Sequence, residues 1–233
     1  LKNPMAEKIL PRLSEEEMQT YIETELTEAS KVLPANYKKG DKNYGRFTAG
    51  LAHTVLLKLY MLTKQWDKAE AEGRELMKPE YGFELVPEYK DIFTLANEKN
   101  PEIIWACQCA KGYQEHKWQP HVLPNDYNFT SYLDKMTKWN GYKISWDFMQ
   151  TFDPADRRLL TIAYEYTSKD GVVHNEKNDR PDPSAQLYLG AVPLKYEFDP
   201  DCTGEDSQID WIIYRYADVL TLTAEAIVRN KNA

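Results

Sequence analysis

The sequence has few cysteines and no long apolar run. It holds three cysteines in 233 residues, and their spacing fits neither a disulfide framework nor a metal site. We therefore expect packing thiols. The longest apolar stretch, around residues 55–62, is interrupted by Lys58 and is too short to cross a membrane. The first residues are charged and contain two prolines, unlike a signal peptide.

An excess of basic residues is also lacking. The net charge is -8 and the isoelectric point is about 5.2, which argues against nucleic acid or an acidic membrane surface as a partner, because both select a basic face. Aromatic residues are plentiful instead: 16 Tyr, 6 Trp and 7 Phe make up 12% of the chain. Many of them lie outside the helices that the sequence predicts, so the aromatic content exceeds the needs of a helical core.

The clearest local pattern is a helical hairpin at residues 45–78. Residues 48–63 are apolar around most of a helix, whereas residues 66–77 are apolar on one face, which predicts a surface helix over a buried one. Ala52, Ala69 and Gly73 allow the two backbones to approach closely. The step from Tyr60 to Ala69 equals the Tyr-to-Ala step of a tetratricopeptide repeat. The pattern therefore predicts one tetratricopeptide-like pair.

Other helices and strands are predicted on both sides of this hairpin. Ser14 and Glu17 form a capping box that starts a helix at Glu15. Residues 102–109 and 159–166 read as strands, and residues 169–171 as a hairpin turn. The remaining predictions are short helices at 88–95 and 145–152, a loop at 175–184, extended pieces at 194–198 and 211–214, and a helix at 216–228. That last helix has an apolar stripe and no following helix, so we expect it to be the first helix of a further pair.

Residues 110–143 have no usable periodicity but are rich in aromatic side chains. An irregular segment of this length is usually functional or disordered, and its aromatic content argues against disorder. A sugar ring offers apolar C–H faces and a hydroxyl rim, so flat aromatic rings with polar neighbours suit it. The predicted binding residues are Trp118, Tyr127, Trp139, Tyr142, His116 and Asn128, with Asn125, Asp126 and Asn140 nearby. The alternative is that Tyr127 and Trp139 pack a small core beneath the loop.

Catalytic and metal chemistry have less support. A glycosidase needs two carboxylates at a defined separation, and the sequence shows no nucleophile or metal signature, so we expect no enzyme and no cofactor. The carboxylates considered are Asp126, Asp134, Asp147, Asp153 and Asp156. A metal site at His116, His121 and Asp126 is the weaker alternative to surface histidines. Trp66, Trp105, Trp146 and Trp211 lie on predicted helices or strands and are expected in the core.

An ordered set of motifs resembles the SusD/RagB family. It runs from YIETELTEASKVLP at residues 21–34 through GRFTAGLAHTVLLKLYM at 45–61, YGFEL at 81–85, YKDIF at 89–93 and NPEIIW at 100–105 to YRYADVL at 214–220 and AEA at 224–226. The last two motifs are the most specific part. The resemblance implies a mainly α fold, a tetratricopeptide-like superhelix with a loop-rich irregular region containing short strands.

The resemblance also implies a division of the chain and a function. It implies one partial SusD-like domain over residues 1–233, with a helical scaffold at 14–78, an irregular region at 79–210 and a further helix at 211–233. Members of the family have additional segments at both ends, so we expect a fragment. Such proteins are lipid-anchored at the outer-membrane surface, where they capture oligosaccharides without catalysis for a SusC-like TonB-dependent transporter. The alternatives are a protein-interaction module or peptide uptake by the same system.

Overall fold

The computed structural model describes residues 11–127, 136–202 and 204–231. The chain forms two compact units. The first consists of Leu1–Phe83 together with Tyr216–Ala233, and the second of Glu84–Arg215. The first unit is helical and the second combines short strands, short helices and loops, so the mainly α character that the sequence predicts is confirmed.

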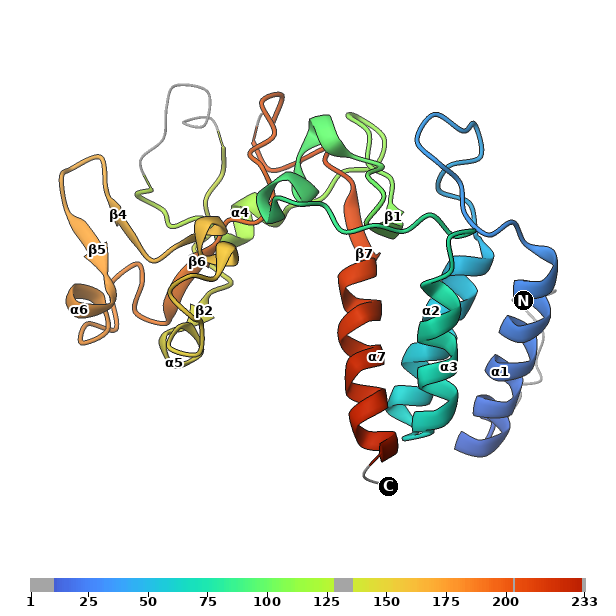
Figure 1. Cartoon of the computed structure of the whole chain (residues 1–233). Coiled ribbons are helices and arrows are strands. Elements are labelled where there is room, and N and C mark those ends of the chain that lie inside the picture. Colours follow the sequence, from blue (N-terminus) through green and yellow to red (C-terminus); the bar gives the residue numbers. More distant parts are fainter. Residues whose placement is uncertain (1–10, 128–135, 203, 232–233) are drawn as a thin grey trace. The chain divides into compact units, whose positions relative to one another are not determined.

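Four helices stand side by side in the first unit (Figure 1): α1 (Glu15–Val32), α2 (Ala49–Leu62), α3 (Trp66–Leu76) and α7 (Tyr216–Lys231). The capping box of Ser14 and Glu17 starts α1 as predicted. Helix α2 has more buried residues than α3 or α7, whereas α1 has none among its own residues. The predicted buried helix with a surface helix over it is therefore confirmed in α2 and α3.

Helix α7 packs closely against α3. Gly73 of α3 faces Thr223 of α7 so closely that a Cβ on Gly73 would lie 1.9 Å from the Thr223 hydroxyl oxygen. Lys58 of α2 forms an ion pair with Asp218 of α7. The buried residues of α7 are Val219, Thr223 and Ala226. The apolar stripe that has no later helix in the sequence to cover it thus packs within the first unit.

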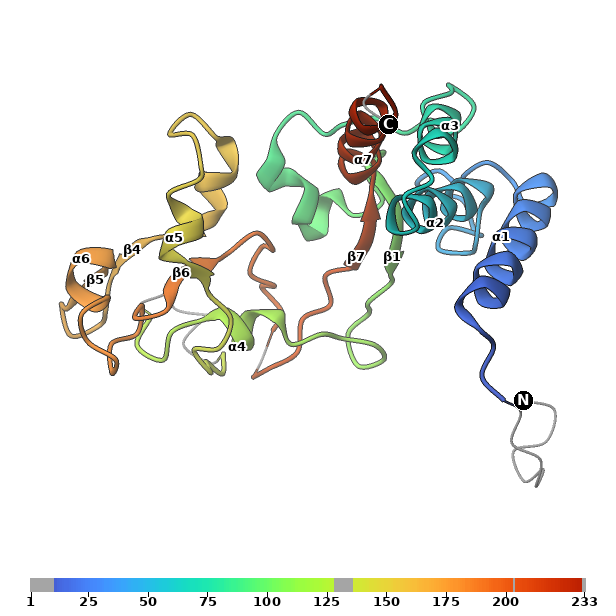
Figure 2. The same cartoon turned by 90° about the horizontal axis from the view of Figure 1, so that it is seen from below.

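In the second unit, β1 (Ile103–Cys107) and β7 (Trp211–Arg215) form an antiparallel pair (Figure 2). The buried carboxylate of Glu102, directly before β1, pairs with the guanidinium of Arg215 at the end of β7. Two 3-10 helices, η1 (Tyr89–Phe93) and η2 (Leu95–Asn97), precede β1. Ile92 and Phe93 of η1 form a small core with Tyr196 and Ile209.

The remaining elements of the second unit are short. They are α4 (Trp118–Val122), β2 (Ile144–Ser145), α5 (Trp146–Met149), η4 (Arg157–Thr161), β3 (Ile162–Ala163), β4 (Glu165–Thr167), β5 (Val173–Asn175), α6 (Glu176–Asp179) and β6 (Gly190–Pro193). Strand β6 lies between β2 and β3, and β4 pairs with β5. Their core is built from Val122, Leu123, Met136, Trp146, Tyr166, Leu187, Ala191, Val192 and Cys202.

Several predicted elements differ from the structure. The strand expected at 159–166 is a 3-10 helix followed by two short strands, because Asp156 caps η4 by accepting from the Arg158 amide. Residues 194–198, expected to be extended, follow β6 and form no strand. The loop expected at 175–184 contains α6, which Asn175 caps. The turn at 169–171 is confirmed between β4 and β5, with Gly171 at φ +81°.

Residues 11–127, 136–202 and 204–231 contain neither a membrane-spanning helix nor a disulfide. No helix there has the length and apolar character needed to cross a bilayer. Cys107, Cys109 and Cys202 are all free thiols. Burial raises the pKa of the Cys202 thiol to about 11, so this thiol stays protonated and behaves as a packing group.

Candidate functional site

The aromatic residues around α4 are placed by backbone hydrogen bonds. The amides of Trp139 and Asn140 donate to the carbonyls of Pro120 and Leu123, each at 2.8 Å. The amides of Gly141 and Tyr142 both donate to the His121 carbonyl, also at 2.8 Å. Four hydrogen bonds therefore attach residues 139–142 to the backbone of α4 and its end.

This attachment depends on two unusual backbone positions. Asn140 has φ +52°, a left-handed conformation that asparagine tolerates better than most residues. At Gly141 a Cβ would lie 2.6 Å from the His121 carbonyl oxygen, too close for any other residue without a shift of the backbone. The Asn-Gly pair thus lets the segment reverse direction beside α4 and bring the rings of Trp139 and Tyr142 against His121.

The ring of His121 lies between two exposed aromatic side chains. Its centroid is 4.7 Å from that of Trp139, at an interplanar angle of 76°, and 5.1 Å from that of Tyr142. Tyr142 in turn stacks on Trp118, with ring centroids 6.2 Å apart. Trp139 is 39% exposed and Tyr142 is 57% exposed. We call Trp118, His121, Trp139 and Tyr142 the aromatic surface.

Trp118 is the member of the aromatic surface that connects it to the core. It is half-buried, packs against both cores of the second unit, and contacts the rings of Tyr196 and Trp211. Its indole nitrogen is buried and has no hydrogen-bond partner among the described residues. Trp118 therefore fixes Tyr142, while the exposed faces belong to Tyr142 and Trp139.

Two lysines lie beside the aromatic surface. The Lys117 ammonium is 5.9 Å from the Trp139 ring centroid and forms an ion pair with Glu205 at 2.6 Å. The Lys143 ammonium donates to the Val122 carbonyl at 3.2 Å. Burial lowers the pKa of Lys143 to about 8. A pKa of about 8 leaves Lys143 mostly protonated at pH 7, while Glu205 offsets the charge of Lys117.

Two other predicted binding residues lie in the core. The His116 ring is half-buried and contacts Trp211, with ring centroids 5.0 Å apart. Burial lowers the pKa of His116, so it is neutral at pH 7. Tyr127 packs on Tyr166 at 4.7 Å beside the core around Trp146, and burial raises the pKa of Tyr127. The core-packing alternative therefore describes Tyr127, whereas Trp139 is exposed.

The other predicted polar residues have mixed positions. Asn128 and Asp134 lie outside the described residues. Asn125 is exposed, and its amide donates to the side chain of Gln186. The side-chain oxygen of Asn140 is buried and lacks a partner among the residues the structure describes. Of the two described asparagines, Asn140 is the one attached to the aromatic surface.

The carboxylates considered for catalysis serve structural contacts. Asp126 accepts from the Tyr166 hydroxyl and pairs with His174, and Asp147 pairs with Arg180. Asp156 pairs with Arg158, which holds the pKa of Asp156 below its usual value, while Asp153 accepts from the Ala155 amide. Within the described ranges no three His, Cys, Asp or Glu side chains are grouped to hold a metal ion. The arrangement offers stacking surfaces and hydrogen bonds rather than a pair of reactive acids.

The sequence interpretation missed His121 as the centre of the aromatic surface. It treated this histidine only as part of a metal alternative, because spacing along the chain does not show that residues 139–142 fold back onto α4. The sequence did contain one indication of this fold-back. Asn140-Gly141 lies between Trp139 and Tyr142, and Asn-Gly strongly favours a turn. Trp118, Trp139 and Tyr142 are brought together as a group.

Comparison with known proteins gives structural matches only. No protein-family model matches the sequence, and no curated protein matches it. Among solved structures, a SusD-like protein from Bacteroides fragilis has 22% sequence identity and a TM-score of 0.71, covering 99% of this chain and 52% of that one. Surface glycan-binding protein A from Bacteroides uniformis has 21% identity and a TM-score of 0.69, covering 92% and 45%.

A third match is a ligand complex. Surface glycan-binding protein A from Bacteroides thetaiotaomicron in complex with laminarihexaose has 16% identity and a TM-score of 0.66, covering 92% of this chain and 49% of that one. The chain thus spans about half the length of the solved structures it matches. At these identities the likeness concerns the fold, and the resemblance found in the motifs is confirmed at that level. The protein has the fold of the SusD-like proteins, over about half of their length.

Proposed function

We propose that the protein binds a neutral oligosaccharide on the aromatic surface and does so without catalysis. The observation that carries this proposal is the exposure of Trp139 and Tyr142, both in contact with the His121 ring and held by four backbone hydrogen bonds. A rigid pair of aromatic faces matches the C–H faces of successive sugar rings and loses little conformational entropy on binding.

Two further points support this proposal. Three structural neighbours share the fold, and one of them is a complex with laminarihexaose. Asp126 and Asp147, two of the carboxylates considered for catalysis, are engaged in structural contacts, which favours binding over hydrolysis.

The test is calorimetry on the full-length protein with laminarihexaose, maltohexaose, cellohexaose and mannohexaose. We expect Trp139→Ala and Tyr142→Ala each to weaken the affinity for the bound saccharide about tenfold, since one aromatic contact contributes up to roughly 1.5 kcal/mol. Because both side chains are exposed, the urea midpoint should stay within error of the wild type. Tyr113→Ala is the matched control, since Tyr113 is 94% exposed and lies outside the surface. Unchanged affinity in both variants rejects this site, and binding of a peptide panel in place of saccharides supports peptide uptake.

We further propose that the protein works at the outer-membrane surface with a SusC-like TonB-dependent transporter, and that α1, α2, α3 and α7 belong to a tetratricopeptide-like superhelix. The close packing of α3 on α7 and the family motifs support this assignment. Co-purification of the full-length protein with the transporter from outer-membrane fractions tests the partnership. Loss of the transporter on mutation of the aromatic surface, with saccharide affinity retained, favours the protein-interaction alternative.

A further inference from the structure

A pocket lies in the Glu84–Arg215 unit, formed by residues that do not belong to the aromatic surface. Its volume is about 430 Å³, and it is bordered by α5, β4, β5 and α6. This volume lies in the lower part of the range for small-molecule sites, roughly 300–1,000 Å³. We call it the α5 pocket, and the residues that line it are Trp146, Met149, Gln150, Tyr164, Glu165, Asn175, Glu176 and Lys177.

One part of the α5 pocket is apolar. The Trp146 indole nitrogen donates to the Leu187 carbonyl at 2.9 Å. Only the carbon atoms of its ring are therefore available to contact a ligand. Met149 lies on the same helical turn. Tyr164 also lines the pocket and is 54% exposed, which leaves its ring available to a ligand. These side chains provide apolar faces for a flat ring.

The polar side chains include three that are not committed to another contact. Among the described residues, none makes a hydrogen bond with the Gln150 amide, the Tyr164 hydroxyl or the Lys177 ammonium. Together they supply both donors and acceptors. A sugar hydroxyl both donates and accepts, so a mixed set of this kind suits a saccharide better than a ligand with one kind of polar group.

The charges favour a neutral ligand. Two carboxylates line the pocket: Glu165 accepts from the Asn175 amide at 2.8 Å, and Glu176 pairs with Arg180 at 2.6 Å. Lys177 is the one cation among the residues that line it. Because Arg180 offsets Glu176 and Lys177 balances Glu165, the pocket has no net positive charge to favour a ligand with its own carboxylate or phosphate.

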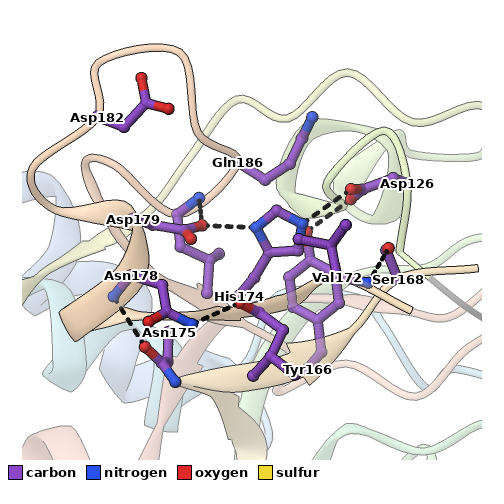
Figure 3. Close-up of polar contacts among 12 residues, drawn as sticks. Asp126, Tyr166, Ser168, Val172, His174, Asn175, Asn178, Asp179, Asp182 and Gln186 are labelled. Atoms are coloured by element: carbon purple, nitrogen blue, oxygen red, sulfur yellow. Dashed lines mark hydrogen bonds and ion pairs between the residues drawn. The ribbon is translucent and has the colours of Figure 1, made fainter. Parts of the chain in front are cut away.

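The wall formed by β5 and α6 is held firmly by His174 (Figure 3). The His174 Nδ1 is 2.7 Å from the Asp179 carboxylate, and its Nε2 is 3.0 Å from the Asp126 carboxylate. The Tyr166 hydroxyl donates to Asp126 at 2.7 Å. Because side chains alternate along a strand, His174 is buried while Asn175 takes part in the pocket.

The contacts of His174 with Asp179 and Asp126 fix one wall of the α5 pocket. Asp179 is the last residue of α6 and also accepts from the Leu187 amide at 2.9 Å. Asn175 caps α6 and bonds to Glu165 across the hairpin. The backbone positions that present Glu165 and Lys177 are therefore fixed by buried contacts before a ligand arrives, which lowers the entropic cost of binding.

We propose that the α5 pocket is a second saccharide site, which takes one neutral sugar ring of an oligosaccharide. The inference rests on the proposed function in assigning a glycan ligand, but it concerns different residues. Tyr164 stacks on the ring, while Gln150, Glu165 and Lys177 bond to its hydroxyls. Sugar acids are disfavoured, because the pocket offers no net positive charge to their carboxylates.

The test is hydrogen–deuterium exchange of the full-length protein, followed by mass spectrometry, with the same four hexasaccharides at saturating concentration. Peptides covering residues 144–150 and 164–177 report on the α5 pocket, and peptides covering 116–122 and 136–143 report on the aromatic surface. We expect at least one hexasaccharide to protect both sets. Oligogalacturonate, which carries a carboxylate on each ring, should leave 144–150 and 164–177 unprotected.

Variants assign the protection to the pocket. Tyr164→Ala and Gln150→Ala should each raise the saccharide concentration needed for half-protection of 164–177 about five- to tenfold and leave protection of 136–143 unchanged. Tyr113→Ala should change neither. Both replaced side chains are exposed, so a folding defect is not expected, and the urea midpoint checks this.

The outcomes separate the two proposals. Protection of 116–122 and 136–143 without protection of 144–150 and 164–177 overturns the second site and supports the aromatic surface. Protection of the pocket peptides alone supports the second site and overturns the aromatic surface. Protection of neither set by any hexasaccharide overturns both, and protection of the pocket by oligogalacturonate overturns its neutral selectivity.

Discussion

His174 is a buried side chain with a carboxylate oxygen at each ring nitrogen. We expect His174→Ala to lower the free energy of unfolding by about 3 kcal/mol, because it leaves the buried Asp179 without its partner. Urea unfolding measures the change. Arg180→Ala is the matched control, since Arg180 and Asp147 form an ion pair that is mostly exposed and should contribute less than about 1 kcal/mol. Equal losses in the two variants would contradict the buried role of His174.

Glu98 gives a prediction about pH. Burial raises the pKa of Glu98 to about 7, although its carboxylate accepts from the Asp210 amide at 2.7 Å. Between the ordinary glutamate pKa and this value, the folded state holds a proton that the unfolded state releases. Stability must therefore fall as the pH rises through this window and stay low above it. Burial also raises the pKa of Asp210, which acts in the same direction.

Glu98→Gln tests this linkage. The amide oxygen can still accept from the Asp210 amide, but the ionisable group is gone. We expect the thermal midpoint of the wild type to drop more between pH 5 and pH 8 than that of the variant. Scanning calorimetry at the two pH values makes the comparison. A variant whose midpoint changes with pH as much as the wild type's would show that Glu98 is not the linked group.

Among the helices, the contact between α3 and α7 is the most sensitive to a small change. A Cβ at position 73 would lie 1.9 Å from the Thr223 hydroxyl oxygen and 2.8 Å from the Thr223 Cβ. Alanine normally stabilises a helix by about 1 kcal/mol relative to glycine. Here we expect the opposite sign, with Gly73→Ala lowering the free energy of unfolding by about 1–3 kcal/mol, because the helices must separate.

A double-mutant cycle identifies the cause. Thr223→Ala removes the hydroxyl and methyl that meet the new Cβ, so Gly73→Ala should cost less in that background. Circular dichroism during urea unfolding gives the four free energies. Additive effects of the two substitutions would mean that the loss arises elsewhere.

The sequence predicted the helices of the first unit well because their signals are local. Apolar periodicity and the Ser14 capping box place α1, α2, α3 and α7 close to their observed bounds. The short elements of the second unit were predicted poorly. Helix α4, for example, lies in a segment without periodicity and is stabilised by residues 139–142 folding back onto it.

The aromatic surface was predictable in composition but not in geometry. Sequence chemistry identified Trp118, Trp139 and Tyr142, yet it grouped Tyr127 with them, because an exposed ring and a core ring look alike in sequence. Burial depends on contacts across long separations, such as the bridge between His116 and Ser207. Local patterns carry no information about such contacts.

At the scale of the whole molecule, the second unit is an insertion in the first. The chain leaves the first unit at Phe83 and re-enters at Tyr216, and the rings of these two residues lie 6.0 Å apart between centroids. We expect replacement of residues 84–215 by about four Gly/Ser residues, which span this gap easily, to leave a helical, cooperatively unfolding protein. Far-ultraviolet circular dichroism with thermal unfolding checks this. A spectrum without helix, or a gradual transition, would show that the first unit needs the insertion.

The insertion also sets an order for folding during synthesis. Lys58 and its partner Asp218 are 160 positions apart in the sequence, so α7 leaves the ribosome long after α1, α2 and α3. Contacts at such separation are slow to form, and closing the loop is easier once residues 84–215 have folded and shortened the free chain. Until then the face of α3 around Gly73 lies open. The nascent protein therefore exposes the buried side of α3 around Gly73 until α7 emerges and covers it.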